Sequence, residues 1–289
     1  MKLQKGDTIG IIALSGDCDK DKIDSAVLEL QKLGYNTKLS KNIYKSDRYL
    51  AGSDEEKIAE LHSFFEDKDV KLILNMRGGY GAIRLINKIN YDLIKSNYKP
   101  FVGYSDITAL LLMIYKKTGM ITYHGPMGVN FGVNFGVGVN VGVSEFVYKN
   151  LLKALSGEVL NLEGNKTYVQ GDAEGIIWGG NLATVTSLCG IDFIPDKNFI
   201  FFAEDINEPV YKIDRMFTQL FNIEKFRSKC KGIILGEFID VDNTKWLEEF
   251  FKTLPVPAVG GFKITHGEEN ITIPIGRSSK LNDTTLVIE

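Results

Sequence analysis

A serine at the junction between a predicted strand and a predicted helix is the side chain best placed for nucleophilic chemistry. Residues 101–102 are typical of the end of a buried strand, and residues 107–117 carry apolar side chains at the spacing of a helix face. Ser105 therefore lies at a sharp turn that lifts its hydroxyl clear of the sheet and directs helix N-terminal N–H groups at the group it attacks. Asp106 suits the first helical turn, where a carboxylate meets the positive end of the helix dipole. The alternative is that Ser105 is simply the helix N-cap.

A serine nucleophile needs a base, and the base needs a carboxylate that orients it. His266 is one of three histidines and lies in a loop after a predicted strand, which suits a catalytic group better than a core group. Glu204 directly follows the apolar strand 199–203, where a carboxylate can enter a crevice. The order Ser105, Glu204, His266 is compatible with a triad. His124 is a second candidate base, but we favour a buried histidine whose ring hydrogen-bonds the backbone.

A glycine-rich turn, RGGYG at residues 77–81, follows the predicted strand 70–76 and precedes a helix that begins at Ala82. Such a turn brings backbone N–H groups close to an anion or to a developing oxyanion. Phosphate binding is one alternative, although the turn matches GxGxxG only in part and lacks the pattern GxxxxGK[ST]. A second alternative is that the glycines allow tight packing of the strand on the helix.

The first half of the chain alternates predicted strands and helices, which indicates a parallel, doubly wound α/β sheet. The ligand crevice of such a sheet lies at the carboxyl ends of its strands. The turns that contain Gly78 and Ser105 both follow strands, so we expect them in one crevice. The predicted strands are residues 8–14, 35–39, 70–76, 101–102 and 121–127, with helices at 21–33, from 53 onward, at 107–117 and at 144–155.

The second half is richer in short predicted strands, which indicates a mixed α/β or β-rich domain. The polar, turn-rich segment 157–169 is the expected link between the two domains. Residues 128–143 form a short-period Gly-Val-Asn repeat that is too short for a solenoid. We interpret the repeat as a loop or irregular hairpin, and no function follows from it.

The composition is that of a globular protein with one large or two ordinary domains: 289 residues, 44% of them hydrophobic and 25% charged. A net charge of -3 without a basic stripe argues against a nucleic-acid partner. No apolar run reaches the roughly 18 residues that a membrane helix needs. Cys18, Cys189 and Cys230 are scattered and lack metal-ligand spacing, which favours a reducing compartment. We therefore expect a cytoplasmic protein without a metal site.

Six motifs follow one another along the chain: RGGYGAIRLI, VGYSDITALL, YHGPM, EGIIWGGNLATVTSLCG, EDINEPVYKIDRMFTQL and THGEENITIPIG. Together they resemble the LD-carboxypeptidase family of serine peptidases, which also contains the microcin C immunity proteins. The resemblance covers nearly the whole chain, and six motifs in order are far more specific than any one of them. It implies a flavodoxin-like N-terminal domain over residues 1–160 and a smaller, swivelling, β-rich α/β C-terminal domain over residues 168–289.

The resemblance also implies a triad between the two domains, with Ser105 as nucleophile, Glu204 as orienting acid and His266 as base. The backbone N–H groups of Asp106 and Gly79 would form the oxyanion hole. The implied reaction is hydrolysis of the amide bond to the terminal D-alanine of a murein tetrapeptide, with no cofactor. The implied partner is this small peptide, and the family tends to form homodimers.

A tetrapeptide substrate ends in a carboxylate, so we expect a cationic side chain at the site. Arg77 and Arg215 are the candidates, with a structural ion pair as the alternative for Arg215, and Gly78 is expected beside the substrate with Arg77. Two features depart from the family pattern. Thr265 stands where the family usually has glycine before the catalytic histidine, and the repeat 128–143 replaces an ordinary variable segment.

Three other functions stay open at the level of sequence. The microcin immunity branch hydrolyses peptidyl- or aminoacyl-nucleotide amides and needs an aromatic platform, for which Trp178 and Trp246 are the only tryptophans. Trp178, beside two glycines, suits packing better. A non-enzymatic protein would bind an anion at the turn 77–81. An ordinary α/β-hydrolase esterase is disfavoured because the nucleophile segment lacks the second glycine of GxSxG.

Overall fold

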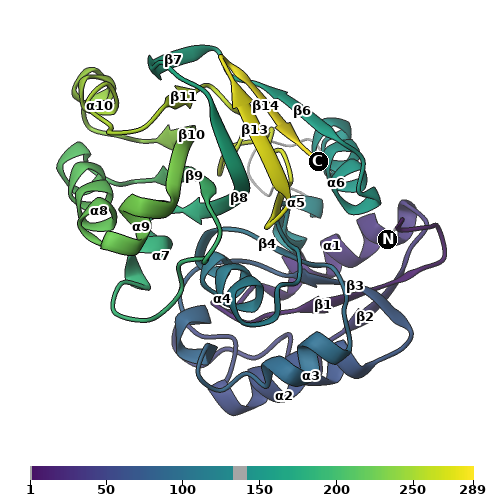
Figure 1. Ribbon diagram of the computed structural model, residues 1–289. Coiled ribbons are helices and arrows are strands. Elements are labelled where there is room, and N and C mark those ends of the chain that lie inside the picture. Colours follow the sequence, from purple (N-terminus) through teal and green to yellow (C-terminus); the bar gives the residue numbers. More distant parts are fainter. Residues whose placement is uncertain (1, 133–141) are drawn as a thin grey trace.

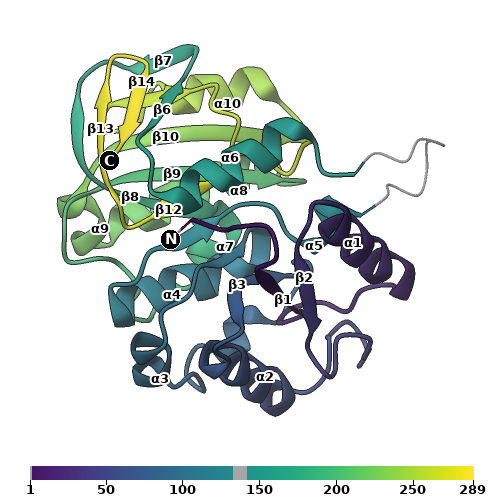
Figure 2. The ribbon, with the colours of Figure 1, turned by 90° about the vertical axis from the view of Figure 1, so that its right-hand side faces the viewer.

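The computed structural model describes residues 2–132 and 142–289, which form two β-sheets. The first half of the chain, in purple and blue, lies below the second half, in green and yellow (Figure 1). Two helices of the first half, α2 (Asp54–Glu66) and α3 (Tyr91–Ser96), lie side by side below its sheet in both views (Figures 1 and 2). No helix in the described part of the chain is long and apolar enough to cross a membrane.

The first sheet has five parallel strands in the order β2-β1-β3-β4-β5, which is the flavodoxin-like order. The inner strands β1, β3 and β4 are almost completely buried, as expected where helices cover both faces of a parallel sheet. The prediction of a doubly wound, flavodoxin-like sheet is confirmed. The strands are β1 (Thr8–Ile12), β2 (Asn36–Leu39), β3 (Val70–Asn75), β4 (Phe101–Gly103) and β5 (Thr122–His124).

Local sequence explains where the helices of this half begin and end. α2 starts with a capping box in which the side chains of Ser53 and Glu56 each accept the other's backbone N–H. α4 (Thr108–Thr118) ends at Gly119, whose φ of 74° is a left-handed conformation that glycine adopts without strain. The remaining helices are α1 (Lys20–Lys32), η1 (Ala82–Leu85), η2 (Ser105–Ile107), α5 (Gly128–Phe131) and α6 (Glu145–Ser156).

The second sheet is mixed and has the strand order β6-β14-β13-β8-β9-β10-β11-β7. The four central strands β8 to β11 are parallel, and antiparallel strands complete both ends. The prediction of a β-rich mixed domain is confirmed. Its strands are β6 (Leu160–Glu163), β7 (Lys166–Val169), β8 (Ala173–Asn181), β9 (Phe199–Ile206), β10 (Cys230–Ile239), β11 (Ala258–Gly260), β13 (Ser278–Asn282) and β14 (Thr285–Ile288), and its helices are α7 (Leu182–Ser187), α8 (Val210–Asn222), α9 (Glu224–Lys229) and α10 (Thr244–Phe251).

Two segments depart from a simple division of the chain. The expected link, residues 157–169, contains β6 and β7, which pair with β14 and β11 of the second sheet. The late strand β12 (Ile273–Ile275) pairs antiparallel with β5 and extends the edge of the first sheet. The chain thus returns to the first sheet after it has built most of the second. The domain ranges 1–160 and 168–289, and the swivelling of the second domain, stay predictions.

The start of α4 holds the two halves together at the ends of their strands. The N–H of Asn181, at the end of β8, donates to Thr108 Oγ1 at 3.3 Å. A Cβ on Gly180 would lie only 2.5 Å from Thr108 Cγ2, so the close approach requires glycine there. Asn181 also pairs in register with Glu204 of β9. This contact therefore places the turn before α4 close to the strand that carries Glu204.

Candidate active site

Ser105 follows β4 and begins the short 3₁₀ turn η2 that leads into α4. Its φ of 58° lies in the left-handed region, which residues other than glycine rarely adopt and which marks a strained turn. Gly78 lies directly against it, because a Cβ on Gly78 would lie 2.9 Å from both Cβ and Oγ of Ser105. The N-cap alternative is wrong, since Tyr104 occupies the N-cap position of this turn. The geometry is the strained strand-to-helix turn predicted for a nucleophile.

The predicted base and the predicted acid are in direct contact. Glu204 lies in β9 and is completely buried, and His266 lies in the loop after β11 with 14% of its side chain exposed. His266 Nδ1 is 2.6 Å from Glu204 Oε2. A buried carboxylate bound at Nδ1 fixes the tautomer of the ring and leaves Nε2 as the nitrogen that can accept a proton.

One cavity of about 440 Å³ brings the predicted nucleophile and base together. Ser105 and His266 both line it, and so do Arg77, Gly78 and Gly79. The turn 77–81 and the turn at Ser105 therefore share one crevice, as the parallel sheet predicts. The lining also includes Lys22, Tyr104, Val129 and Asn130.

The two predicted oxyanion donors are close to Ser105 in the chain or through Gly78: Asp106 follows Ser105, and Gly79 follows Gly78, which lies against Ser105. Gly79 has a φ of 110°, and its N–H makes no backbone hydrogen bond within residues 2–132 and 142–289. Asp106 lies in the first turn of η2, where N–H groups have no partner within the helix. Its nitrogen would lie 3.5 Å from a Cβ on Gly78. The two predicted oxyanion donors thus lie on the two turns that meet at Ser105.

The electrostatics of the site favour a strong base at His266. Burial lowers the pKa of His266, but the hydrogen bond and the charge of Glu204 outweigh burial and hold this pKa above its ordinary value. His124 is completely buried, and burial lowers its pKa to about 3, so it stays neutral beside the base. Its ring packs edge-on against Tyr104 and Phe202. The buried position was predicted, but no expected backbone hydrogen bond forms, since neither ring nitrogen has a partner among the described residues.

Arg77 is a cation of the cavity that makes no ion pair with any described carboxylate. Its Nη1 donates to the carbonyl of Asp17 at 2.9 Å, which leaves the positive charge available to a ligand. Arg215 lies on α8, outside the cavity lining, with its guanidinium 6.0 Å from the ring centroid of Tyr211. The structure therefore favours Arg77 over Arg215 as the anion-binding residue.

In the part of the chain that the structure describes, no group of His, Cys, Asp or Glu side chains could hold a metal ion.

Comparison with known proteins identifies the family of this chain. Residues 9–125 match the LD-carboxypeptidase N-terminal domain, and residues 174–281 match the LD-carboxypeptidase C-terminal domain. The chain is 37% identical over 307 residues to a probable murein peptide carboxypeptidase of Bacillus subtilis (strain 168). The alignment covers 99% of this chain and 93% of that protein. The chain belongs to the LD-carboxypeptidase family. The family consists of serine peptidases, so the predicted enzyme class is confirmed.

Two other members show how far the LD-carboxypeptidase resemblance extends. The microcin C7 self-immunity protein of Escherichia coli is 30% identical over 311 residues, which cover 95% of this chain and 90% of that protein. The crystal structure of a muramoyltetrapeptide carboxypeptidase from Oxalobacter formigenes matches with a TM-score of 0.85 at 26% identity and covers 97% of each chain. This chain therefore shares its fold with that structure over nearly its whole length.

The loop that carries His266 is organised by Thr265, the departure from the family pattern. The Thr265 hydroxyl donates to Glu237 Oε2 at 2.6 Å and accepts the Gly267 N–H at 2.8 Å. The Thr265 N–H donates to Asn270 Oδ1 at 3.1 Å. These bonds close the loop and tie it to β10, so the threonine does not prevent His266 from reaching its carboxylate partner.

Among the lining residues that the sequence analysis did not assign to the site are Tyr104 and Asn130. The Tyr104 ring meets the His266 ring edge-on, with centroids 4.9 Å apart, and Asn130 Nδ2 donates to the Tyr104 hydroxyl at 3.4 Å. Asn130 belongs to the Gly-Val-Asn repeat, whose first residues, 128–131, form the helix α5 where a loop or hairpin was expected. Residues 133–141 of the repeat lie outside the described residues. Tyr104 precedes the nucleophile and was within reach of the motif argument, whereas nothing in the repeat itself indicates a place at the cavity.

Proposed function

We propose that this LD-carboxypeptidase hydrolyses the amide bond to the terminal D-alanine of murein tetrapeptides through Ser105, Glu204 and His266. The observation that carries the proposal is the 2.6 Å contact between His266 Nδ1 and Glu204 Oε2 at a cavity that Ser105 also lines. A hydroxyl, an imidazole and a buried carboxylate are the groups that acyl transfer requires. The similarity to a relative named as a probable murein peptide carboxypeptidase supports the substrate class.

The first half of the reaction forms an acyl-enzyme. His266 Nε2 accepts the proton of the Ser105 hydroxyl as Oγ attacks the carbonyl carbon of the scissile amide. The positive charge that develops on the imidazole faces the Glu204 carboxylate, which also holds the ring in place. The imidazolium then gives its proton to the amine of D-alanine, the C–N bond breaks, and the shortened peptide stays bound to Oγ as an ester.

The second half returns the enzyme to its starting state. A water molecule loses a proton to His266 Nε2 and attacks the carbonyl carbon of the ester. When the tetrahedral intermediate collapses, the same proton returns to Ser105 Oγ and the shortened peptide leaves. Because both halves use one nitrogen in turn as base and acid, a His266 that is fixed at Nδ1 by Glu204 serves all four proton transfers.

The oxyanion of each tetrahedral intermediate accepts hydrogen bonds from the backbone N–H groups of Gly79 and Asp106. Donors of this kind act in fixed positions, and each typically contributes about 3 kcal/mol to the stability of the transition state. The missing side chain at Gly78 leaves room for the substrate carbonyl, since a Cβ there would lie 2.9 Å from Ser105 Oγ.

Arg77 binds the terminal carboxylate of the substrate. Its guanidinium lines the cavity beside Ser105 and makes no ion pair within residues 2–132 and 142–289. Guanidinium groups bind carboxylates through two parallel hydrogen bonds, which would orient the D-alanine residue as well as hold it. A free carboxylate next to the scissile bond is what distinguishes a carboxypeptidase substrate from an internal peptide bond.

The nucleotide amides of the microcin immunity branch fit this cavity less well. Trp178 is completely buried, with its ring centroid 5.0 Å from that of Phe199, so the predicted packing role is confirmed. Trp246 is 62% exposed on α10 and does not line the cavity. Neither tryptophan therefore offers a platform for a nucleobase. The cytoplasmic location and the homodimer stay predictions.

The substrate assignment is tested by release of free D-alanine. The protein is incubated with a murein tetrapeptide, with the same peptide ending in L-alanine, and with the pentapeptide that ends in D-alanyl-D-alanine. We expect D-alanine from the tetrapeptide, and no cleavage of the other two. No release by folded protein, or faster hydrolysis of an aminoacyl-nucleotide amide than of the tetrapeptide, would overturn the assignment.

A further inference from the structure

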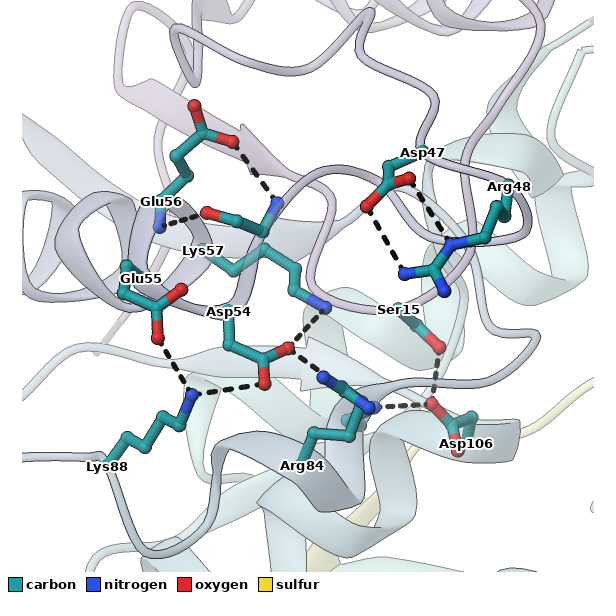
Figure 3. A network of polar contacts seen from close by, with 12 residues as sticks. Ser15, Asp47, Arg48, Asp54, Glu55, Glu56, Lys57, Arg84, Lys88 and Asp106 are labelled. Carbon is teal, nitrogen blue, oxygen red and sulfur yellow. Dashed lines mark hydrogen bonds and ion pairs between the residues drawn. The ribbon is translucent and has the colours of Figure 1, made fainter.

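The side chain of Asp106 forms a buried hydrogen-bonded junction that the mechanism above does not use. Only 8% of Asp106 is exposed. Its Oδ2 accepts the hydroxyl of Ser15, which is completely buried, and the N–H of Ala82 at 2.8 Å (Figure 3). The N–H of Gly81 also hydrogen-bonds this carboxylate. Three donors from two other segments therefore converge on one carboxylate.

These donors lie on both sides of the turn 77–81, which carries the proposed oxyanion donor Gly79 and is called the oxyanion turn below. Gly81 ends the turn 77–81 and Ala82 begins η1. Ser15 precedes Gly16, whose N–H donates to the carbonyl of Gly78 at 3.1 Å. The Asp106 backbone follows Ser105 directly. The Asp106 carboxylate thus links the turn at Ser105 to the turn 77–81, which carries the Gly79 N–H. It does so through the end of that turn and through the segment after β1 that packs against it.

A buried lysine lies close enough to Asp106 to interact with its charge. Lys57 is completely buried on α2, and its ammonium attracts Asp106 electrostatically. A Cβ on Gly81 would lie 3.4 Å from Lys57 Nζ, so the ammonium lies beneath the end of the oxyanion turn. Lys57 Nζ also pairs with Asp54 Oδ1 at 3.4 Å. Burying an ammonium is costly unless such partners surround it.

The far end of this network is anchored by surface cations. Asp54 accepts Arg84 Nε at 2.9 Å and Lys88 Nζ at 3.1 Å. Burial raises the pKa of Asp54, but these partners outweigh burial and hold it at about 2. In Figure 3, dashed lines join Asp54 to Lys88, Lys57 and Arg84, and a separate dashed line joins the Asp106 carboxylate to Ser15. Burial lowers the pKa of Lys57, and the negative charges of Asp54 and, less strongly, Asp106 oppose this lowering.

We infer that the Asp106 side chain, with Lys57 as its buried counter-ion, is a positioning group that holds the Gly79 N–H at its working distance from Ser105. The inference rests on the proposed function. It separates two roles of one residue, because the backbone N–H of Asp106 contacts the oxyanion whereas its carboxylate acts through the turn 77–81. A displacement of about 1 Å in such a turn is enough to slow catalysis about 100-fold.

The test begins with Asp106→Asn, which keeps the backbone N–H and the shape of the side chain but removes the charge. We expect kcat to fall about 100-fold, because the Asp106 side chain no longer holds the turn 77–81 firmly in place. KM should change little, because Arg77 still binds the substrate carboxylate. The rate at which a fluorophosphonate labels Ser105 should fall in parallel. Lys57→Met should have a similar effect, and Lys45→Met serves as the matched control, since Lys45 pairs with Glu56 at an exposed site.

The double variant Asp106→Asn/Lys57→Met separates positioning from simple folding stability. It removes the charges of both Lys57 and Asp106, while Asp54 keeps Arg84 and Lys88 as partners. We therefore expect its melting temperature to recover towards that of the wild type relative to Lys57→Met alone. The Asp106 carboxylate that holds the turn 77–81 is still missing in this variant, so kcat should stay low. Recovery of kcat together with the melting temperature would mean a purely structural role and would overturn the inference.

The outcomes also distinguish this inference from the proposed function. If the wild type labels at Ser105 and releases D-alanine, but the variants do so at wild-type rates, the positioning role is wrong and the proposed function stands. If the wild type labels at Ser105 but releases no D-alanine, the substrate assignment fails and the labelling rates of the variants still decide the positioning role. An unlabelled wild type would overturn both.

Discussion

Glu204 and His266 are 62 positions apart in the sequence, yet Oε2 and Nδ1 lie 2.6 Å from each other. The order β9-β10-β11 explains the contact, because the carboxyl ends of these parallel strands lie on one edge of the second sheet. Glu204 lies near the end of β9, and the loop after β11 passes the end of β10, where Thr265 bonds to Glu237. The contact between the proposed acid and the proposed base is therefore a product of strand order in the second sheet.

Glu204→Gln should lower kcat by about 10⁴-fold, because an amide does not stabilise the imidazolium and favours the wrong tautomer at Nδ1. Asp205→Asn is the matched control. Asp205 is the neighbouring buried carboxylate, but it accepts from Asn181 Nδ2 and from the Ala183 N–H, both at 2.8 Å. We expect Asp205→Asn to lower stability and to keep kcat within an order of magnitude of the wild type. Steady-state kinetics that show equal losses in both variants would contradict the role of Glu204.

The pH dependence of kcat/KM should reveal the raised pKa of His266. The base must be neutral, so activity falls as pH decreases through this pKa, and the acid limb should lie above the ordinary value of 6.5. Removal of the Glu204 charge by Glu204→Gln removes the cause of the shift, so the limb should move to lower pH. A limb at or below 6.5 in the wild type, or one that does not move in the variant, would argue against the contact in solution.

Gly78→Ala should abolish most activity without unfolding the protein. The new Cβ would lie 2.9 Å from Ser105 Cβ and Oγ, so either the nucleophile or the turn 77–81 must shift. Gly119→Ala is the control, since Gly119 has a φ of 74° but no atom within 4 Å of a Cβ there. That variant should lose stability and keep kcat. Melting curves and kcat measured together show whether each variant loses stability or catalysis. A fully active Gly78→Ala would show that the close contact between Gly78 and Ser105 is not critical.

Arg77→Gln should raise KM about 10–100-fold with a smaller change in kcat, the expected effect of losing a charge-assisted hydrogen bond to a substrate carboxylate. Arg215→Gln provides the control, because Arg215 packs over Tyr211 and lies outside the cavity lining. The dependence on Arg77 should disappear with a tetrapeptide whose terminal carboxylate is amidated. An unchanged KM in Arg77→Gln would assign carboxylate binding to another group.

The first domain could be predicted from the sequence because its signals are local. The alternation of apolar strands with helices such as 107–117 indicates a parallel sheet. Because the ligand crevice of such a sheet lies at the carboxyl ends of its strands, Ser105 and Gly78 could be predicted to lie in one crevice. The nucleophile turn itself is encoded within a few residues of Ser105. The same reasoning identified Glu204 and His266 as groups at the ends of strands.

The second domain depends on pairings between distant segments, which local patterns do not encode. β6 and β7 are strands of only four residues, and their partners β14 and β11 lie far along the chain. Local sequence therefore predicted a link between domains at this segment. The return of β12 to the first sheet has the same origin. The buried network of Lys57 and Asp106 was also out of reach, since charged residues on a helix usually indicate a solvent-exposed face, whereas Asp54, Lys57 and Glu60 of α2 are all buried.

The most direct test of the triad is release of D-alanine from a murein tetrapeptide by the wild type beside Ser105→Ala. The account predicts release by the wild type and a loss of about 10⁴-fold or more in the variant, with an unchanged melting curve. Release that survives Ser105→Ala in a folded protein would contradict the assignment of Ser105 as the nucleophile.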